Sequence, residues 1–209
     1  MRLRIMSATQ QRDLAGRLAP TEPARALSTA RAIRDPWFAC QALAWVARCA
    51  PESEFSKIID ESLGAVRDEV DHYRAVAPAA WPIRAIVERN HLELLPSVIP
   101  ELLLRAEKIE LLVSRSEALF LLFQAVFLAG RKHWLPVLQS LRRASTPLIN
   151  WRQKRNLSFA IMIVRGDDEQ LALEMYNALD DEKLKKQVTK MWSNSDRHSP
   201  RSFFWTVDA

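Results

Sequence analysis

Residues 35–50, DPWFACQALAWVARCA, decide the fold, because their apolar positions recur further along the chain. Ala39, Leu43, Val46 and Ala47 have the spacing of the buried face of a helix. Three later segments repeat this frame, the last of them in part. The matching residues are Ala79, Ile83, Ile86 and Val87, then Ala118, Leu122, Ala125 and Val126, then Ser158, Ile161 and Met162.

A second predicted helix, with its own register, follows each of these segments. Its members align as Phe55, Leu95, Trp134 and Leu171, then Ile59, Ile99, Leu138 and Met175, then Ser62, Leu102, Leu141 and Ala178. The first of these sets recurs at steps of 40, 39 and 37 residues. Such a period, with two helices per unit, indicates an all-α fold, a right-handed α-solenoid of about four to five repeats.

The segment ALSTARAIRDPWFACQALAWVARCA, residues 26–50, resembles a known repeat unit. Its pattern A-x-x-I-x-D, six further residues and A-L-x-x-V-A is similar to units of bacterial helical-repeat proteins, the HEAT-like and tetratricopeptide-like superfamilies. The period exceeds the 34 residues of a tetratricopeptide repeat, which favours the HEAT-like class. The resemblance implies the fold and has little bearing on function. Some HEAT-like proteins are DNA glycosylases, but no motif of theirs is matched here.

Composition agrees with one helical domain. The chain has 209 residues, of which 48% are hydrophobic and only four are glycine, so a substantial all-α core is expected. We expect one domain at 1–193, followed by a C-terminal tail at 194–209. The predicted repeat units lie near 8–34, 35–71, 72–109, 110–146 and 147–192.

Prolines and capping residues predict where helices begin. Asp35 followed by Pro36 is typical of an N-cap and a first helical residue, and Thr21 to Pro23 and Thr146 with Pro147 predict two further starts. Pro78 and Pro82 predict a late or kinked helix in the second unit. Of Pro96 and Pro100 only one fits a first turn, so a break or a bent start is expected there.

The most apolar stretch, EALFLLFQAVFLAG at 117–130, is predicted to be a central core helix. Its 13 apolar-rich residues from Ala118 are fewer than the roughly 20 of a membrane span, and Gln124 interrupts them. No membrane partner is therefore expected. The amino-terminal residues do not match a signal peptide, and Cys40 and Cys49 fall on opposite faces of one predicted helix. A reduced, cytoplasmic protein with buried thiols is expected.

Charge is distributed unevenly along the chain. Residues 118–166 contain eight basic residues and no acidic one, while the whole chain has a formal net charge of +5. Residues 52–71 contain seven acidic residues and two basic ones. The candidate binding residues are Arg131, Lys132, Arg142, Arg143, Trp151, Arg152, Lys154 and Arg155.

Helix dipoles divide these basic residues into two groups. Arg131, Lys132, Arg142, Arg143 and Arg165 are predicted at helix C-termini, where the dipole favours a cation. By contrast, WRQKRN at 151–156 is predicted to begin a helix, where positive charge is disfavoured. An anionic partner for this segment is one interpretation and a solvated helix face is the other.

The tail has an aromatic run, Phe203, Phe204 and Trp205. One interpretation is a cap over the exposed apolar face of the last repeat, since terminal repeats require a cover. The other is a short peptide that docks on a partner through aromatic anchors.

Motifs for catalysis, metals or cofactors are missing from the sequence: it has no phosphate-binding glycine loop, HExxH, CxxC or G-x-S-x-G. His72, His91, His133 and His198 are scattered, so no cofactor and no metal is expected. The expected function is a non-catalytic protein or peptide interaction module. The alternatives are a nucleic-acid binder that uses the basic 131–155 region and a DNA-processing enzyme of HEAT-like architecture.

Overall fold

The chain folds as a stack of helices. The computed structural model describes residues 6–193 and 199–204, and within these ranges it contains helices and connecting turns but no strand. The all-α prediction is therefore confirmed. In chain order the helices are α1 (Ala8–Leu18), α2 (Pro23–Arg31), α3 (Pro36–Cys49), α4 (Glu52–Arg67), α5 (His72–Val76), α6 (Ala80–Glu88), η1 (Leu92–Leu94), α7 (Leu95–Glu107), α8 (Leu112–Val126), η2 (Phe127–Ala129), α9 (Arg131–Ala144), α10 (Trp151–Arg165), α11 (Glu169–Asn177) and α12 (Glu182–Ser193).

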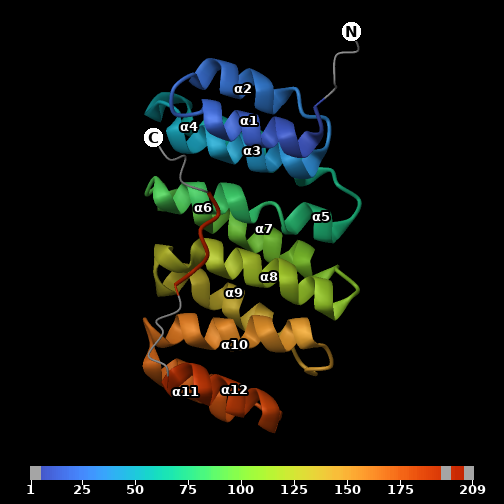
Figure 1. Cartoon of the computed structure of the whole chain (residues 1–209), viewed down its shortest axis with the longest axis vertical. Helices are drawn as coiled ribbons and strands as arrows, with labels where there is room; N and C mark the ends of the chain where they lie inside the picture. Colours follow the sequence, from blue (N-terminus) through green and yellow to red (C-terminus); the bar gives the residue numbers. More distant parts are fainter. Residues whose placement is uncertain (1–5, 194–198, 205–209) are drawn as a thin grey trace.

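These helices lie across the long axis of the molecule, with α1 and α2 at one end and α11 and α12 at the other (Figure 1). One row runs through the stack: α1 packs on α3, α3 on α6, α6 on α8, and α8 on α10. Helices α4, α7 and α9 lie behind this row (Figure 1), and α4 and α9 pack on their predecessors α3 and α8. Helices α3 and α8 therefore have neighbours both within the row and behind it.

Burial follows the repeated positions of the sequence through most of the chain. Leu43, Ile83 and Leu122, which occupy one predicted place, are all less than 5% exposed. The aligned positions are not all buried near α11, where Leu171 is only partly buried and Ala178 is exposed. Helix α11 ends at Asn177, so Ala178 is a cap residue, and the buried positions there are Ala172, Met175 and Leu179.

Local capping explains where the helices start. The Asp35 carboxylate accepts the Trp37 N–H at 2.9 Å and begins α3, as predicted. The start predicted at Thr146 and Pro147 is wrong, because α10 begins at Trp151. Asn150 and Gln153 form a reciprocal capping box there, in which the Asn150 side chain accepts a backbone N–H of the first turn and the Gln153 side chain accepts the Asn150 N–H. Helix α2 begins at Pro23, directly after its N-cap residue Glu22.

Proline interrupts the first helix of the unit at 72–109 but not the second, α7. A late or kinked helix was expected here; the chain instead forms α5, which ends at Val76, and α6, which begins at Ala80 after Pro78. Pro96 lies in the first turn of α7, after the short η1 turn. Pro100 lies inside α7, and the helix continues to Glu107. The break is absent because buried side chains on both sides of Pro100 hold the helix against the stack, which offsets one lost backbone hydrogen bond.

Helix α8 is central, as its all-round apolar sequence predicts. It packs against α6, α9 and α10, and Leu119, Leu122 and Val126 are fully buried. The stretch Leu112–Ala129 also meets the length and hydropathy of a membrane span, with half of it buried inside the protein. A core helix satisfies the same two criteria, so this stretch is weak evidence for a membrane span.

Both cysteines are free thiols. Cys40 is buried in α3, where burial raises the pKa of its thiol to about 12. Cys49, expected to be buried, is exposed at the end of the same helix. The expectation failed because Cys49 is the last residue of α3 and lies on the face opposite to that of Cys40.

Candidate peptide-binding site

The basic residues predicted from the sequence lie at both ends of α9 and at the start of α10. Arg142 and Arg143 occupy the last turn of α9, as expected. Arg131 and Lys132 were expected at a helix C-terminus, but they form the first turn of α9. Gly130, with a φ of 92°, terminates the preceding η2 turn, and the chain enters α9 directly after it. That placement makes their charge unfavourable to the helix dipole.

Acidic side chains of neighbouring helices neutralise the start of α10. Arg152 and Arg155 both reach the Glu117 carboxylate of α8, each at 3.7 Å. Lys154 contacts the Asp181 carboxylate before α12 at 2.5 Å, and this contact is the main reason that the pKa of Asp181 is lowered. Acids of the same chain therefore lie beside the basic start of α10.

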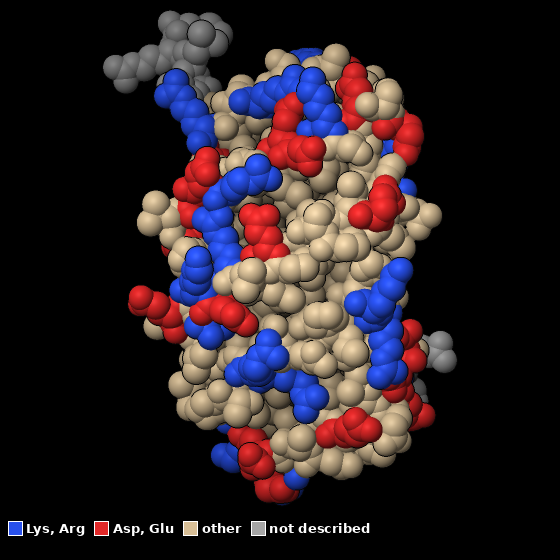
Figure 2. Space-filling model, turned by 180° about the vertical axis from the view of Figure 1, so that it is seen from behind, with Lys and Arg blue, Asp and Glu red and all other residues tan. Residues whose placement is uncertain are grey.

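The basic residues at the two ends of α9 are only partly paired with acids. Arg131 pairs with Asp168, Arg143 lies 3.9 Å from Glu107, and Lys132 forms no ion pair with a described residue. On the face opposite to that of Figure 1, red groups lie near most of the blue ones, and several blue groups adjoin along one side (Figure 2). The excess of positive charge in residues 118–166 is thus largely balanced by acids from outside that range.

Trp151 is the one aromatic residue among the candidate binding residues of α9 and α10, and it is 62% exposed. The guanidinium groups of Arg152 and Arg155 lie 5.6 and 5.2 Å from its ring centroid. Its own helix therefore supplies the cations that stack on it.

The C-terminal segment at residues 199–204 makes a second, different site. It lies in front of the row of helices, between the level of α8 and that of α6 (Figure 1). Side chains hold its backbone at two points. The Arg201 N–H donates to Gln124 Oε1 of α8 at 3.1 Å, and the Trp81 Nε1–H of α6 donates to the Phe203 carbonyl oxygen at 3.1 Å.

Two aromatic side chains anchor this segment. Phe203 and Phe204 are 3% and 4% exposed. Phe203 packs edge-on against Trp81, with ring centroids 5.2 Å apart, and Phe204 packs edge-on against Trp45 of α3 at 5.1 Å. The expected cap over the last repeat is therefore wrong for these two residues, which lie on α3 and α6. Trp205 lies outside the described residues.

Cations complete the contacts of the segment. Arg48 of α3 lies over the Phe204 ring at 4.6 Å from its centroid. Arg201 of the segment lies 5.7 Å from the Trp81 ring and 5.2 Å from the Phe203 ring. Burial lowers the pKa of the Arg201 guanidinium. Each such contact contributes about 0.5–2 kcal/mol, depending on how far the cation is removed from water.

The walls of this site are fixed by contacts that do not involve the segment. Gly16 of α1 lies so close to Trp45 that a β-carbon there would be 3.1 Å from the indole ring. Arg48 is held by Glu88 of α6 at 2.6 Å, and Glu88 also pairs with Arg84 at 2.7 Å. Part of the wall is therefore held by contacts between helices, in addition to those with the segment.

Sequence analysis singled out Phe203 and Phe204 as candidates for a cap or for docking, but it did not identify the side chains that they contact. The residues missed were Trp45, Arg48, Trp81, Glu88 and Gln124. One signal was present: Gln124 interrupts the most apolar stretch of the chain. It is 6% exposed, and a buried polar side chain requires a hydrogen-bond partner, here the Arg201 backbone.

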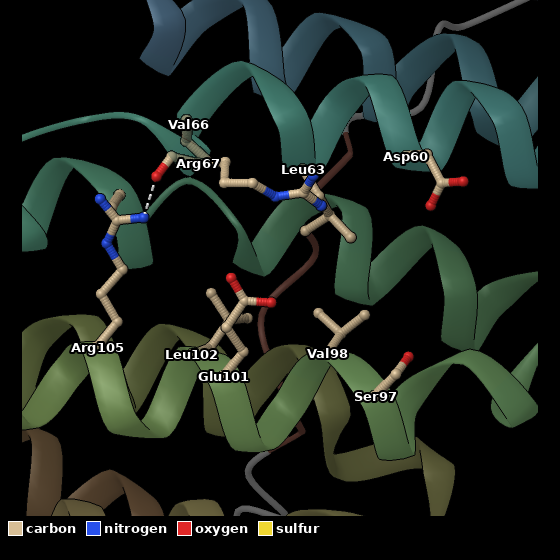
Figure 3. A pocket seen from close by; sticks show the side chains of 10 residues that line it. Asp60, Leu63, Val66, Arg67, Ser97, Val98, Glu101, Leu102 and Arg105 are labelled. Atoms are coloured by element: carbon tan, nitrogen blue, oxygen red, sulfur yellow. Dashed lines mark hydrogen bonds between the residues drawn. The ribbon is translucent and has the colours of Figure 1, made fainter.

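A hollow lies between α4 and α7, and the contacts around it hold these two helices together (Figure 3). Leu63, Val98 and Leu102 form its apolar floor, with Asp60 and Glu101 at its edge. Arg105 donates from α7 to the backbone carbonyl oxygens of Arg67 and Glu69, and so satisfies acceptors at the end of α4.

His91 and His133 both pack against other side chains of the protein. His91 stacks on Phe55 with ring centroids 4.2 Å apart and contacts Glu52. His133 is buried, which, with the nearby Lys132 charge, lowers the pKa of its imidazole. His198 is outside the described residues. Within the described ranges, no three His, Cys, Asp or Glu side chains are grouped as metal ligands.

Comparison of the chain with protein-family models, curated proteins and solved structures finds no match in any of the three.

Proposed function

We propose that this protein is a non-catalytic interaction module that binds an extended peptide segment on the face formed by α3, α6 and α8. One observation supports this most directly. Residues 199–204 already occupy that face as a peptide would, with two buried aromatic anchors and two backbone hydrogen bonds from helix side chains.

The chemistry of the site suits peptides as a class. Gln124 and Trp81 bond to backbone atoms, which every peptide has, whereas Trp45, Trp81 and Arg48 select aromatic side chains. Aromatic anchors in prepared pockets supply most of the binding energy in many interfaces. A rigid wall also lowers the entropy cost of binding.

The same proposal includes a HEAT-like α-solenoid as the scaffold. Its support is the burial of aligned positions about 40 residues apart and the stacking of the helices across one axis (Figure 1). A solenoid offers a long face of successive helices, and α3, α6 and α8 are such a succession.

The two nucleic-acid functions have weaker support. Binding to nucleic acid requires cations that are free to release counterions from phosphate groups. Arg152, Lys154 and Arg155 instead pair with Glu117 and Asp181. A processing enzyme would in addition require a carboxylate facing a basic groove, and both acids are engaged by these cations.

A peptide library tests the proposal. The full-length double variant Phe203→Ala and Phe204→Ala, which vacates the face, is used to select displayed random peptides. Peptides with adjacent aromatic residues should be enriched, and their affinity should fall at least about tenfold when Trp81→Ala is added.

The matched control is Trp37→Ala, which removes an indole of α3 that packs on Tyr73 and not on the segment. It should leave peptide binding unchanged. Failure to enrich any aromatic peptide, or equal losses from both tryptophan changes, would overturn the proposal.

A further inference from the structure

The face of α3, α6 and α8 holds a segment of its own chain, and the contacts of that segment define what else can bind there. From Arg201 to Phe204 the segment presents a cation, one spacer residue and two aromatic rings. The Arg201 and Phe203 side chains both contact Trp81, and Phe204 contacts Trp45. The spacer Ser202 donates a hydrogen bond within the segment to the Phe204 carbonyl oxygen.

The order of these residues is set by the spacing of the receptor side chains. Gln124, Trp81 and Trp45 belong to α8, α6 and α3, which pack in that order along the stack. They contact Arg201, Phe203 and Phe204, in the same order along the segment. A peptide in the reverse direction would place its cation beside Trp45 and Arg48. The Arg48 charge would then repel it.

The receptor favours aromatic residues at the last two positions for electrostatic reasons as well. Arg48 lies over one face of the Phe204 ring, and the edge of Phe204 meets Trp45. A second cation here would be adjacent to Arg48, and an aliphatic side chain would lose the attraction between the guanidinium and the ring.

We infer that residues 199–204 are a self-ligand, and that the partner displacing them is a peptide segment with a basic residue, one spacer and two consecutive aromatic residues. This inference rests on the proposed function. The tether gives the self-ligand an effective concentration on the order of millimolar, so a partner in solution competes against it. Binding is consequently weakened in the intact chain and restored when the self-ligand is removed.

The test measures the affinity of one labelled peptide for three full-length proteins. The peptide has the sequence of residues 199–209, SPRSFFWTVDA, with a fluorophore at its amino terminus. The proteins are the unchanged chain, the Phe203→Ala and Phe204→Ala double variant, and the double variant that also has Gln124→Ala. Circular dichroism confirms that each is folded, and Gln124→Ala is chosen because it removes little packing.

The double variant should bind the peptide at least about tenfold more tightly than the unchanged chain, since the internal competitor is absent. Adding Gln124→Ala should weaken that binding about fivefold, because the Arg201 backbone contact is lost. A peptide with Glu in place of its arginine, and one with Ala in place of its two phenylalanines, should both bind at least about tenfold more weakly.

Equal affinity of the unchanged chain and the double variant would overturn the self-ligand and leave the proposed peptide-binding function standing. Equal affinity of the arginine and glutamate peptides would overturn the basic residue in the recognition pattern. No binding to any of the three proteins would overturn the proposed function together with this inference.

Discussion

At the scale of single residues, the two thiols should differ sharply in reactivity. Only a thiolate reacts with a disulfide reagent, and burial raises the pKa of Cys40 to about 12, so almost none of it is ionised at pH 8. Cys49 is exposed, although its pKa is also raised by partial burial.

We expect one thiol per chain to react in the folded protein and both to react in denaturant, as measured by absorbance of the released thiol. Two fast-reacting thiols under native conditions would show that α3 is less closely packed than its contacts indicate. The variant Cys49→Ser, in which the native reaction should disappear, assigns the signal.

Two helical glycines provide a matched pair of substitutions. A β-carbon added at Gly64, inside α4, would have no neighbouring atom within 4 Å, whereas one added at Gly16 would lie 3.1 Å from the Trp45 ring. Alanine in a helix interior is favoured over glycine by roughly 0.5–1 kcal/mol, so Gly64→Ala should raise the free energy of unfolding by that amount.

Gly16→Ala should lower the free energy of unfolding by about 1 kcal/mol or more, because Trp45 is confined between α1 and the Phe204 ring and cannot move aside. Urea denaturation of both variants gives the comparison. An equal gain from the two substitutions would mean that Trp45 has room to shift.

At the scale of elements, the first turn of α10 depends on an acid of another helix. Arg152, in the first turn of α10, is disfavoured by the helix dipole, and Glu117 of α8 compensates it together with the nearby Arg155. Glu117→Gln should lower the free energy of unfolding by about 0.5–1 kcal/mol, a modest value because these arginine side chains are about half exposed.

Glu110→Gln is the control, since Glu110 is an exposed acid just before α8 and makes no ion pair with a described residue. It changes the net charge equally and should have little effect on urea denaturation. If the two substitutions cost the same, general charge balance and not the specific contact would explain the stability of α10.

At the scale of the whole molecule, basic residues of 131–155 meet acids from outside that range, and acidic and basic groups lie near one another on the face of Figure 2. Because most cations of residues 131–155 pair with acids, we expect nucleic acid to bind weakly. Titration of labelled single-stranded and duplex oligonucleotides should give dissociation constants above about 10 μM at moderate salt.

Reversal of Arg152 and Arg155 to Glu should leave that weak binding nearly unchanged. Salt-sensitive binding at micromolar concentration or tighter, lost in this reversal, would instead favour the nucleic-acid alternative. Light scattering in the same experiment gives the mass of the protein in solution.

Sequence alone determined the all-α class, the central place of α8 and the start of α3, because each follows from contacts within one or two helical turns. Leu119, Leu122 and Val126 share a helix face through their spacing, and Asp35 caps its own helix. The α5 and α6 split around Pro78 is equally local, since proline cannot continue the backbone ladder.

Only the tertiary structure decided where Phe203 and Phe204 lie, and which acids neutralise the basic cluster. Phe203 meets Trp81 across 122 residues of sequence, and Arg152 meets Glu117 across 35. Such pairs arise from the stacking of helices and leave no fixed spacing in the sequence. Apolar periodicity fixes which side of a helix is buried, but the packing of the helices fixes which side chains meet there.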